Sequence, residues 1–250
     1  MAVKLLSRKR DFVLALIYYA QAKRVAKTTL RLPEPDGERV RRFGGDNAVS
    51  LAIFGDSAGA GVGVDSQDDA PLGRIGKGLA EQGLGVNAEL HATSGHTSFD
   101  LLYRLYAMGA CHFDVAIISI GVNDVIKASS DKAWTDNLHA IITLLKRKFG
   151  VSHILFLSLP PMHLAPSLPT PLNGLIGRRA VALSAMLAQI CQVYQGVHYV
   201  KDEFDKAKLD HRLMFAKDGF HPSKLTYGVW ADTLVGCVMK LYFNERGGVH

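Results

Sequence analysis

The stretch VSLAIFGDSAGAGVG, residues 49–63, decides the fold. Its first six residues form a short apolar run rich in β-branched and aromatic side chains, which is typical of a buried strand. The run stops at Gly55, and Ser57 follows among small residues. This pattern predicts that Ser57 stands on a tight turn at the end of the strand, with its hydroxyl exposed as a nucleophile requires. The alternative is that Ser57 only caps the helix that follows, because Ser is a favoured N-cap residue.

Strand and helix patterns alternate along the rest of the chain. Expected strands cover residues 49–54, 86–91, 114–120, 153–159 and 197–200, and expected helices cover 71–82, 98–108, 131–149, 175–194 and 222–242. This alternation predicts an α/β fold in three layers, with a parallel five-stranded sheet covered by helices on both faces. A chain of 250 residues is long enough for one such domain, which we place at residues 49–250.

Polar residues follow four of the five expected strands. They occupy positions 55–57, 93–97, 121–124 and 218–221, the last group lying just before the final expected helix. In an open α/β sheet, ligands bind outside the carboxyl ends of the strands. We therefore expect four loops that are remote in sequence to meet at one edge of the sheet.

The side chains in these loops are complementary in their chemistry. A serine hydroxyl needs an adjacent base, and a third group must orient that base. His221 is the expected base for Ser57, and Asp218 is expected to orient His221. The amides of Ser57 and Gly95 and the side chain of Asn123 are the expected donors to a developing oxyanion.

These residues together resemble the motifs of the SGNH hydrolases, also called the GDSL esterase/lipase family. The four residues that give the family its name correspond here to Ser57, Gly95, Asn123 and His221. Ala58 stands where the name GDSL has Leu, and the resemblance extends over about residues 49–243. Residues 1–48 lie outside these motifs.

The resemblance implies a flavodoxin-like α/β/α domain that hydrolyses carboxylic esters, of short to medium acyl chains, through an acyl-enzyme. That mechanism needs no metal and no organic cofactor. Asp56 is expected to hold the turn through hydrogen bonds to nearby amides. A lysophospholipase or an acyl-thioesterase of the same family is the alternative. A non-catalytic ligand- or nucleotide-binding module is more remote, because the glycines after residue 58 do not have the spacing of a dinucleotide or phosphate loop.

The substrate pocket is expected beside the proline-rich segment 160–171. Met162, Leu164 and Leu168 are predicted to form an apolar wall for the acyl chain of a small-molecule ester. The alternative is that this segment is a rigid surface connector.

Composition and charge limit the partners. The chain carries a net charge of +6, but no nucleic-acid-binding signature accompanies the basic residues, so we expect no nucleic-acid partner and a weak attraction to anionic membranes instead. Three widely spaced cysteines are expected as buried thiols without a metal site. The sequence does not determine the oligomeric state.

The N-terminal segment 1–48 is predicted to form an amphipathic helix followed by an extended connector over residues 31–46. We expect a helical face that includes Leu16 and Tyr19 to pack on the body of the protein. A cleaved signal over residues 1–22 and peripheral membrane contact are alternatives. The expected location is cytoplasmic, with a periplasmic or membrane-associated location as the alternative.

Overall fold

The computed structural model describes residues 2–45, 48–201 and 210–247, and the side chains within 13–243 of these ranges. Asp46, at the end of the predicted connector, and positions 202–209 and 248–250 of the predicted domain lie outside the described residues. In chain order the elements are α1 (Ala2–Thr28), β1 (Val40–Phe43), β2 (Ala48–Gly55), α2 (Ser57–Ala60), α3 (Pro71–Glu81), β3 (Gly85–Ala92), α4 (Ser98–Ala107), β4 (Val115–Ser119), α5 (Val122–Ile126), α6 (Asp131–Lys148), β5 (His153–Leu157), η1 (Met162–Leu164), α7 (Leu172–Cys191), β6 (Val197–Val200), η2 (His211–Leu213) and α8 (Lys224–Gly247).

The sheet has the strand order β1-β3-β2-β4-β5-β6, and β2 to β6 are mutually parallel. The predicted parallel α/β/α architecture is therefore confirmed. The predicted number of five strands is wrong by one, because β1 adds an antiparallel edge strand beside β3. This strand, VRRF, lies inside the predicted connector. Its two arginines hide the strand pattern, but an edge strand tolerates charges that a central strand would not.

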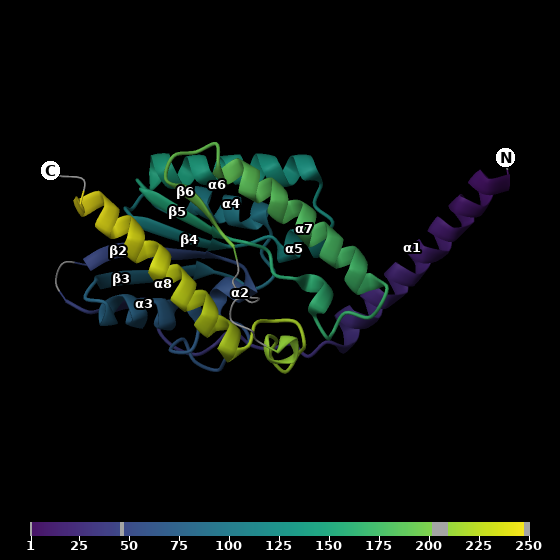
Figure 1. Ribbon diagram of the computed structural model, residues 1–250, viewed down its shortest axis with the longest axis horizontal. Helices are drawn as coiled ribbons and strands as arrows, with labels where there is room; N and C mark the ends of the chain where they lie inside the picture. The colour runs from purple at the N-terminus through teal and green to yellow at the C-terminus, as the bar shows by residue number, and fades with distance from the viewer. Residues whose placement is uncertain (1, 46–47, 202–209, 248–250) are drawn as a thin grey trace.

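Helices cover both faces of the sheet (Figure 1). The alternation of side chains along β2 shows how: Ala52 and Phe54 belong to the core under α4, α6 and α7. Leu51 and Ile53 belong to the core under α3 and α8. A strand buried on both faces reads as a continuous apolar run, which explains the sequence pattern that identified it.

Helix α7 is long and apolar enough by composition to cross a membrane, the one such helix found among the described residues. In the fold it packs against α6. Leu183 and Leu187 are fully buried, and the indole of Trp134 on α6 donates a hydrogen bond to the Leu183 carbonyl at 3.1 Å. Of the cysteines, Cys191 is buried but Cys111 is exposed, contrary to expectation.

Helix α1 extends away from the body of the protein, and its C-terminal part lies against α7 (Figure 1). The predicted helix is present, but it is not amphipathic over its length, and its predicted contact face is also wrong. Leu16 and Tyr19 are 53% and 67% exposed, whereas Tyr18 and Val25 pack on the core.

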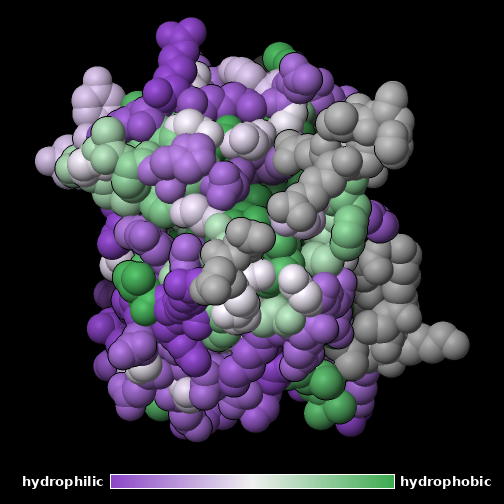
Figure 2. All heavy atoms as spheres, turned by 90° about the vertical axis from the view of Figure 1, so that its left-hand side faces the viewer, coloured by the Kyte–Doolittle hydropathy of each residue, from purple (hydrophilic) through white to green (hydrophobic). Residues whose placement is uncertain are grey.

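At the other end of the molecule, hydrophilic side chains surround a central group of apolar ones (Figure 2).

Candidate active site

Ser57 stands directly after β2, on a turn that requires glycine at its start. Gly55 has φ +154°, and a Cβ there would lie 2.0 Å from the carbonyl oxygen of Ser119 on β4. The next residue, Asp56, is the N-cap of α2, and its side chain accepts a hydrogen bond from the Ala58 amide at 3.0 Å. The alternative interpretation of Ser57 as a helix cap is therefore wrong. Asp56 holds the turn, as expected, and Ser57 begins the helix.

The loop before α8 brings His221 and Asp218 to Ser57. The His221 Nε2 atom lies 2.9 Å from Ser57 Oγ, and His221 Nδ1 lies 2.5 Å from Asp218 Oδ2. The other carboxylate oxygen of Asp218 accepts hydrogen bonds from the amides of Phe220 and His221 at 2.9 and 3.0 Å. Three side chains predicted from two separate motifs thus form one continuous hydrogen-bonded chain.

The pKa values of two carboxyl groups near His221 are shifted in opposite directions. Burial works to raise the pKa of Asp218, but the hydrogen bonds from the His221 ring and from the two loop amides outweigh it and hold this pKa below its ordinary value. Burial raises the pKa of Asp56 to about 7, despite hydrogen bonds from the amides of Ala58 and Gly59. Asp218 is therefore the ionised partner of the histidine near neutral pH.

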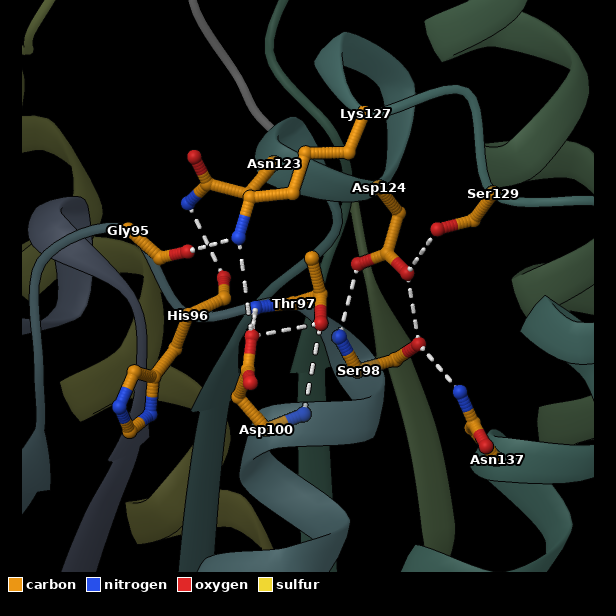
Figure 3. Close-up of polar contacts among 10 residues, drawn as sticks. All are labelled: Gly95, His96, Thr97, Ser98, Asp100, Asn123, Asp124, Lys127, Ser129 and Asn137. Carbon is orange, nitrogen blue, oxygen red and sulfur yellow. Dashed lines mark hydrogen bonds and ion pairs between the residues drawn. The ribbon is translucent and has the colours of Figure 1, made fainter.

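The predicted oxyanion donors lie on the loop after β3 and at the start of α5. Gly95 has φ +85°, and a Cβ there would meet open space, so the backbone conformation rather than crowding accounts for this glycine. Asn123 donates from Nδ2 to the carbonyl of His96 at 3.0 Å, and Lys127 donates to the carbonyl of Gly95 at 3.0 Å (Figure 3). Among the described residues, no acceptor takes a hydrogen bond from the amide of Ser57 or of Gly95.

A network of hydrogen bonds around the buried Asp124 stabilises the helix turn that carries Asn123. The neighbouring Asp124 is fully buried and accepts hydrogen bonds from the amide and hydroxyl of Ser98 at 2.8 and 2.7 Å. The Ser129 hydroxyl donates to the same carboxylate, and Asn137 donates to the Ser98 hydroxyl (Figure 3). These bonds join α4, α5 and α6, and they set the position of the helix turn that carries Asn123.

One polar residue near the site, Glu34, was not predicted from the sequence. Glu34, in the segment predicted as a connector, accepts hydrogen bonds from the Ser94 amide at 2.8 Å and from the Ser94 hydroxyl at 2.7 Å. Its other carboxylate oxygen pairs with Arg39, which donates to the Ala92 carbonyl at 2.9 Å. No motif marks Glu34, because its role depends on a contact with a loop 60 residues away.

An apolar cavity opens beside Ser57. Its walls come from the ends of β4 and β5, from the segment after β5, and from the chain between η2 and α8. The residues that line it are Asp56, Ser57, Ala58, Ser119, Ile120, Val122, Ser158, Leu159, Pro160, Pro161, Met162, Met214, Phe215, Phe220, His221, Pro222, Thr226 and Trp230. Of the predicted wall, only Met162 lines this cavity. Leu168 is buried in the core, and Leu164 lies outside the lining.

A second chain segment links the cavity wall to the triad loop. The amide of Ser167 donates to the Gly219 carbonyl at 3.1 Å, so the proline-rich segment is anchored beside His221.

Among the described residues, no group of three or more His, Cys, Asp or Glu side chains could hold a metal ion.

The site joins a serine hydroxyl to a histidine and the histidine to an ionised carboxylate through hydrogen bonds, at the carboxyl edge of a parallel α/β/α sheet. This arrangement defines the class of serine hydrolase sites. Residues 53–229 match the sequence profile of the GDSL-like Lipase/Acylhydrolase family. The chain therefore belongs to this family, as the resemblance to SGNH hydrolases predicted.

A curated relative carries a similar description, and solved structures share the fold. The GDSL-like esterase Rv1075c of Mycobacterium tuberculosis is 29% identical over 194 residues, which cover 74% of this chain. The chain spans about 60% of the length of that relative. The solved structure of the psychrotrophic esterase EstA from Pseudoalteromonas sp., inhibited by monoethylphosphonate, has a TM-score of 0.59 at 19% identity and covers 79% of this chain and 99% of its own. The solved structure of TesA has a TM-score of 0.58 at 20% identity, and the match covers 74% of this chain and 95% of TesA.

Proposed function

We propose that this protein hydrolyses carboxylic esters of short to medium acyl chains, with Ser57 as the nucleophile, His221 as the general base and Asp218 as the group that orients His221. The observation that carries the proposal is the hydrogen-bonded chain from Ser57 Oγ through the imidazole to Asp218, at 2.9 and 2.5 Å. The distance between Ser57 Oγ and His221 Nε2 lies within the range that proton transfer requires, and the contact with Asp218 orients the imidazole ring.

In the first half-reaction, Ser57 Oγ attacks the ester carbonyl carbon while His221 Nε2 takes the hydroxyl proton. The tetrahedral intermediate collapses, the bond to the alkoxy oxygen breaks, and that oxygen receives the proton from His221. In the second half-reaction, water attacks the acyl-Ser57 carbonyl and gives a proton to His221. The carboxylic acid leaves as Ser57 Oγ regains that proton. Asp218 stays ionised throughout and stabilises the imidazolium.

The negative charge on the carbonyl oxygen would be stabilised by the amides of Ser57 and Gly95 and the side-chain amide of Asn123. The two backbone amides have no acceptor among the described residues, which supports this role. Asn123 uses one amide hydrogen for the His96 carbonyl at 3.0 Å and retains a second.

The apolar cavity supports an acyl-chain subsite. Met162, Phe215 and Trp230 line it together with Ser57, so an acyl chain attached to Ser57 would extend among apolar side chains. The same cavity suits the acyl group of a lysophospholipid or a thioester. These substrates would be cleaved by the same mechanism, so only their relative rates of hydrolysis distinguish them.

The test is a panel of p-nitrophenyl esters with acyl chains of two to sixteen carbons, an acyl thioester and a lysophospholipid, assayed with the natural chain and with Ser57→Ala. We expect the highest kcat/KM on short or medium oxygen esters and no turnover above background by Ser57→Ala. A Ser57→Ala variant that folds and retains turnover would refute the proposal. A preference for thioesters or lysophospholipids would replace the substrate and keep the mechanism.

A further inference from the structure

The positive charge of this chain is concentrated in its N-terminal segment. Residues 1–31 contain eight Lys and Arg residues and one Asp, a net charge of +7, whereas the whole chain carries +6. The rest of the chain therefore carries −1. The net positive charge that would attract an anionic partner therefore lies in α1 and the three residues after it.

Helix α1 also exposes apolar side chains. Val13, Leu16 and Tyr19 are more than half exposed, and Ile17 is 38% exposed. Lys23, Arg24 and Lys27, which are also exposed, follow them on the same helix. The N-terminal part of the helix reaches away from the body (Figure 1), and the apolar side chains named above are exposed. Apolar and basic residues follow one another along α1 and are not separated onto opposite faces. A basic segment next to exposed apolar side chains is attracted to an anionic membrane surface.

We propose that α1 binds the surface of a bilayer that contains anionic lipids. The apolar side chains enter the region between headgroups and acyl chains, and the lysines and arginines pair with anionic headgroups. The helix lies in the interface and does not cross it, because the apolar stretch 12–22 is shorter than the roughly 20 residues that a spanning helix needs.

Gln21 ties this helix to the wall of the cavity. Its side chain donates to the Thr170 carbonyl at 2.8 Å and accepts from the Leu172 amide at 3.1 Å. The segment that ends at these residues begins at the lining residues 158–162. A bilayer bound by α1 is therefore connected through a short, hydrogen-bonded segment to the proposed acyl subsite.

The experiment is co-sedimentation of the full chain with vesicles of phosphatidylcholine alone and of phosphatidylcholine with phosphatidylglycerol, at low and high salt. We expect at least tenfold tighter binding to the anionic vesicles, weakened by salt. The double variant Leu16→Asp, Ile17→Asp should lose at least tenfold in affinity. The control Val193→Asp, which alters a residue that is 71% exposed in the turn after α7, should bind as the natural chain does.

Equal affinity for neutral and anionic vesicles would overturn the proposal, as would binding that the double variant retains. If size-exclusion chromatography showed that the natural chain is a dimer and the double variant a monomer, with no vesicle binding by either, α1 would be a self-association surface and the proposal would be wrong. None of these outcomes depends on ester hydrolysis.

A second inference comes from the contact between Glu34 and Ser94, and it rests on the proposed function. Glu34 and Arg39 hold the loop after β3 at two points, the Ala92 carbonyl and the Ser94 amide and hydroxyl, immediately before Gly95. Lys127 holds the carbonyl of Gly95 from the other side. Both Glu34 and Arg39 lie outside residues 53–229, the part of the chain that the family profile matches.

We infer that Glu34 is a positioning residue for the oxyanion donor Gly95. The two hydrogen bonds to Glu34 fix the amide and the side chain of Ser94. They thereby restrict the next peptide group along the chain, which carries the Gly95 amide hydrogen. Burial works to raise the pKa of Glu34, but the Ser94 hydrogen bonds and the charge of Arg39 outweigh it, so this pKa lies below its ordinary value and the group is ionised. An orientation error at one oxyanion donor slows the chemical step more than it weakens substrate binding.

The test compares kcat and KM for Glu34→Ala, Glu34→Gln and the exposed control Glu38→Ala on the best ester of the panel, together with the melting temperature of each. We expect kcat of Glu34→Ala to fall at least tenfold with KM within about twofold. Glu34→Gln should recover part of this loss, because its side-chain oxygen still accepts from Ser94. Glu38→Ala should match the natural chain.

An unchanged kcat for Glu34→Ala, with Ser57→Ala inactive, would overturn this inference and leave the proposed function intact. A rise in KM with kcat unchanged would also overturn it. Turnover by Ser57→Ala would instead show that the proposed function is wrong.

Discussion

His221 Nε2 lies 2.9 Å from Ser57 Oγ, although 164 residues separate the two in sequence. The sheet produces this contact: β2 ends at the turn that carries Ser57, and the loop before α8 returns His221 to the same edge. Asp218, three residues before His221, completes the arrangement within a single turn.

Asp218→Asn should keep the fold and lose most of the activity. The amide of Asn presents a donor toward His221 Nδ1 and so favours the wrong tautomer of the ring. By analogy with the same change in a serine protease, we expect kcat to fall on the order of 10⁴-fold. Steady-state kinetics on the best ester measures this, with the exposed Asp210→Asn as the matched control. A loss below about tenfold would contradict the role of Asp218.

Asn123→Ala should lower kcat by about 10² to 10³-fold, the usual cost of one oxyanion donor. Asn173→Ala is the matched control, because Asn173 also donates from its side chain to a histidine carbonyl, that of His163 at 3.2 Å, but is not one of the proposed oxyanion donors. It should leave kcat within about twofold. Equal kinetics for the two variants would remove Asn123 from the oxyanion site.

Phe215→Ala should shift the preference toward longer acyl chains. Removing this ring widens the cavity, and each further buried methylene contributes about 0.8 kcal/mol, or roughly fourfold in kcat/KM. The ester panel measures the shift. Leu213→Ala, two residues away and outside the lining, should leave the chain-length profile unchanged. An unaltered profile in Phe215→Ala would place the acyl subsite elsewhere.

Asp56 should make the protein less stable as the pH rises from about 4 to 7. Its pKa is about 7 in the fold against 3.8 for a free side chain, so within this window the native state binds the proton that the unfolded chain has released. The contribution is at most roughly 4 kcal/mol. Urea unfolding at several pH values should show a smaller decline for Asp56→Asn than for the natural chain. Parallel curves would contradict the shift.

The meeting of these residues at one edge of the sheet was predictable because their signals are local. Ser57, Asn123 and the pair Asp218 and His221 each follow an expected strand, and parallel strands bring such positions to one edge. The parallel sheet was predictable for a related reason, since strands buried on both faces leave continuous apolar runs such as residues 49–54.

The remainder depends on contacts that no local pattern records. The edge strand β1 contains two arginines, and its strand character comes from pairing with β3. Glu34 became part of the site because the same connector passes beside Ser94. Leu164 and Leu168 match the expected composition of a pocket wall, but Leu164 lies outside the lining of the cavity and Leu168 is buried in the core. Phe215 and Trp230 take that place from a distant part of the chain.

The most direct test of the account is covalent labelling of the nucleophile. The protein is incubated with an alkyl fluorophosphonate, and the site of modification is located by peptide mass spectrometry. We predict one adduct per chain, on Ser57, with loss of turnover in proportion to labelling and much slower labelling of Asp218→Asn. Labelling of a different serine, or loss of turnover with Ser57 unmodified, would contradict the assignment of Ser57 as the nucleophile.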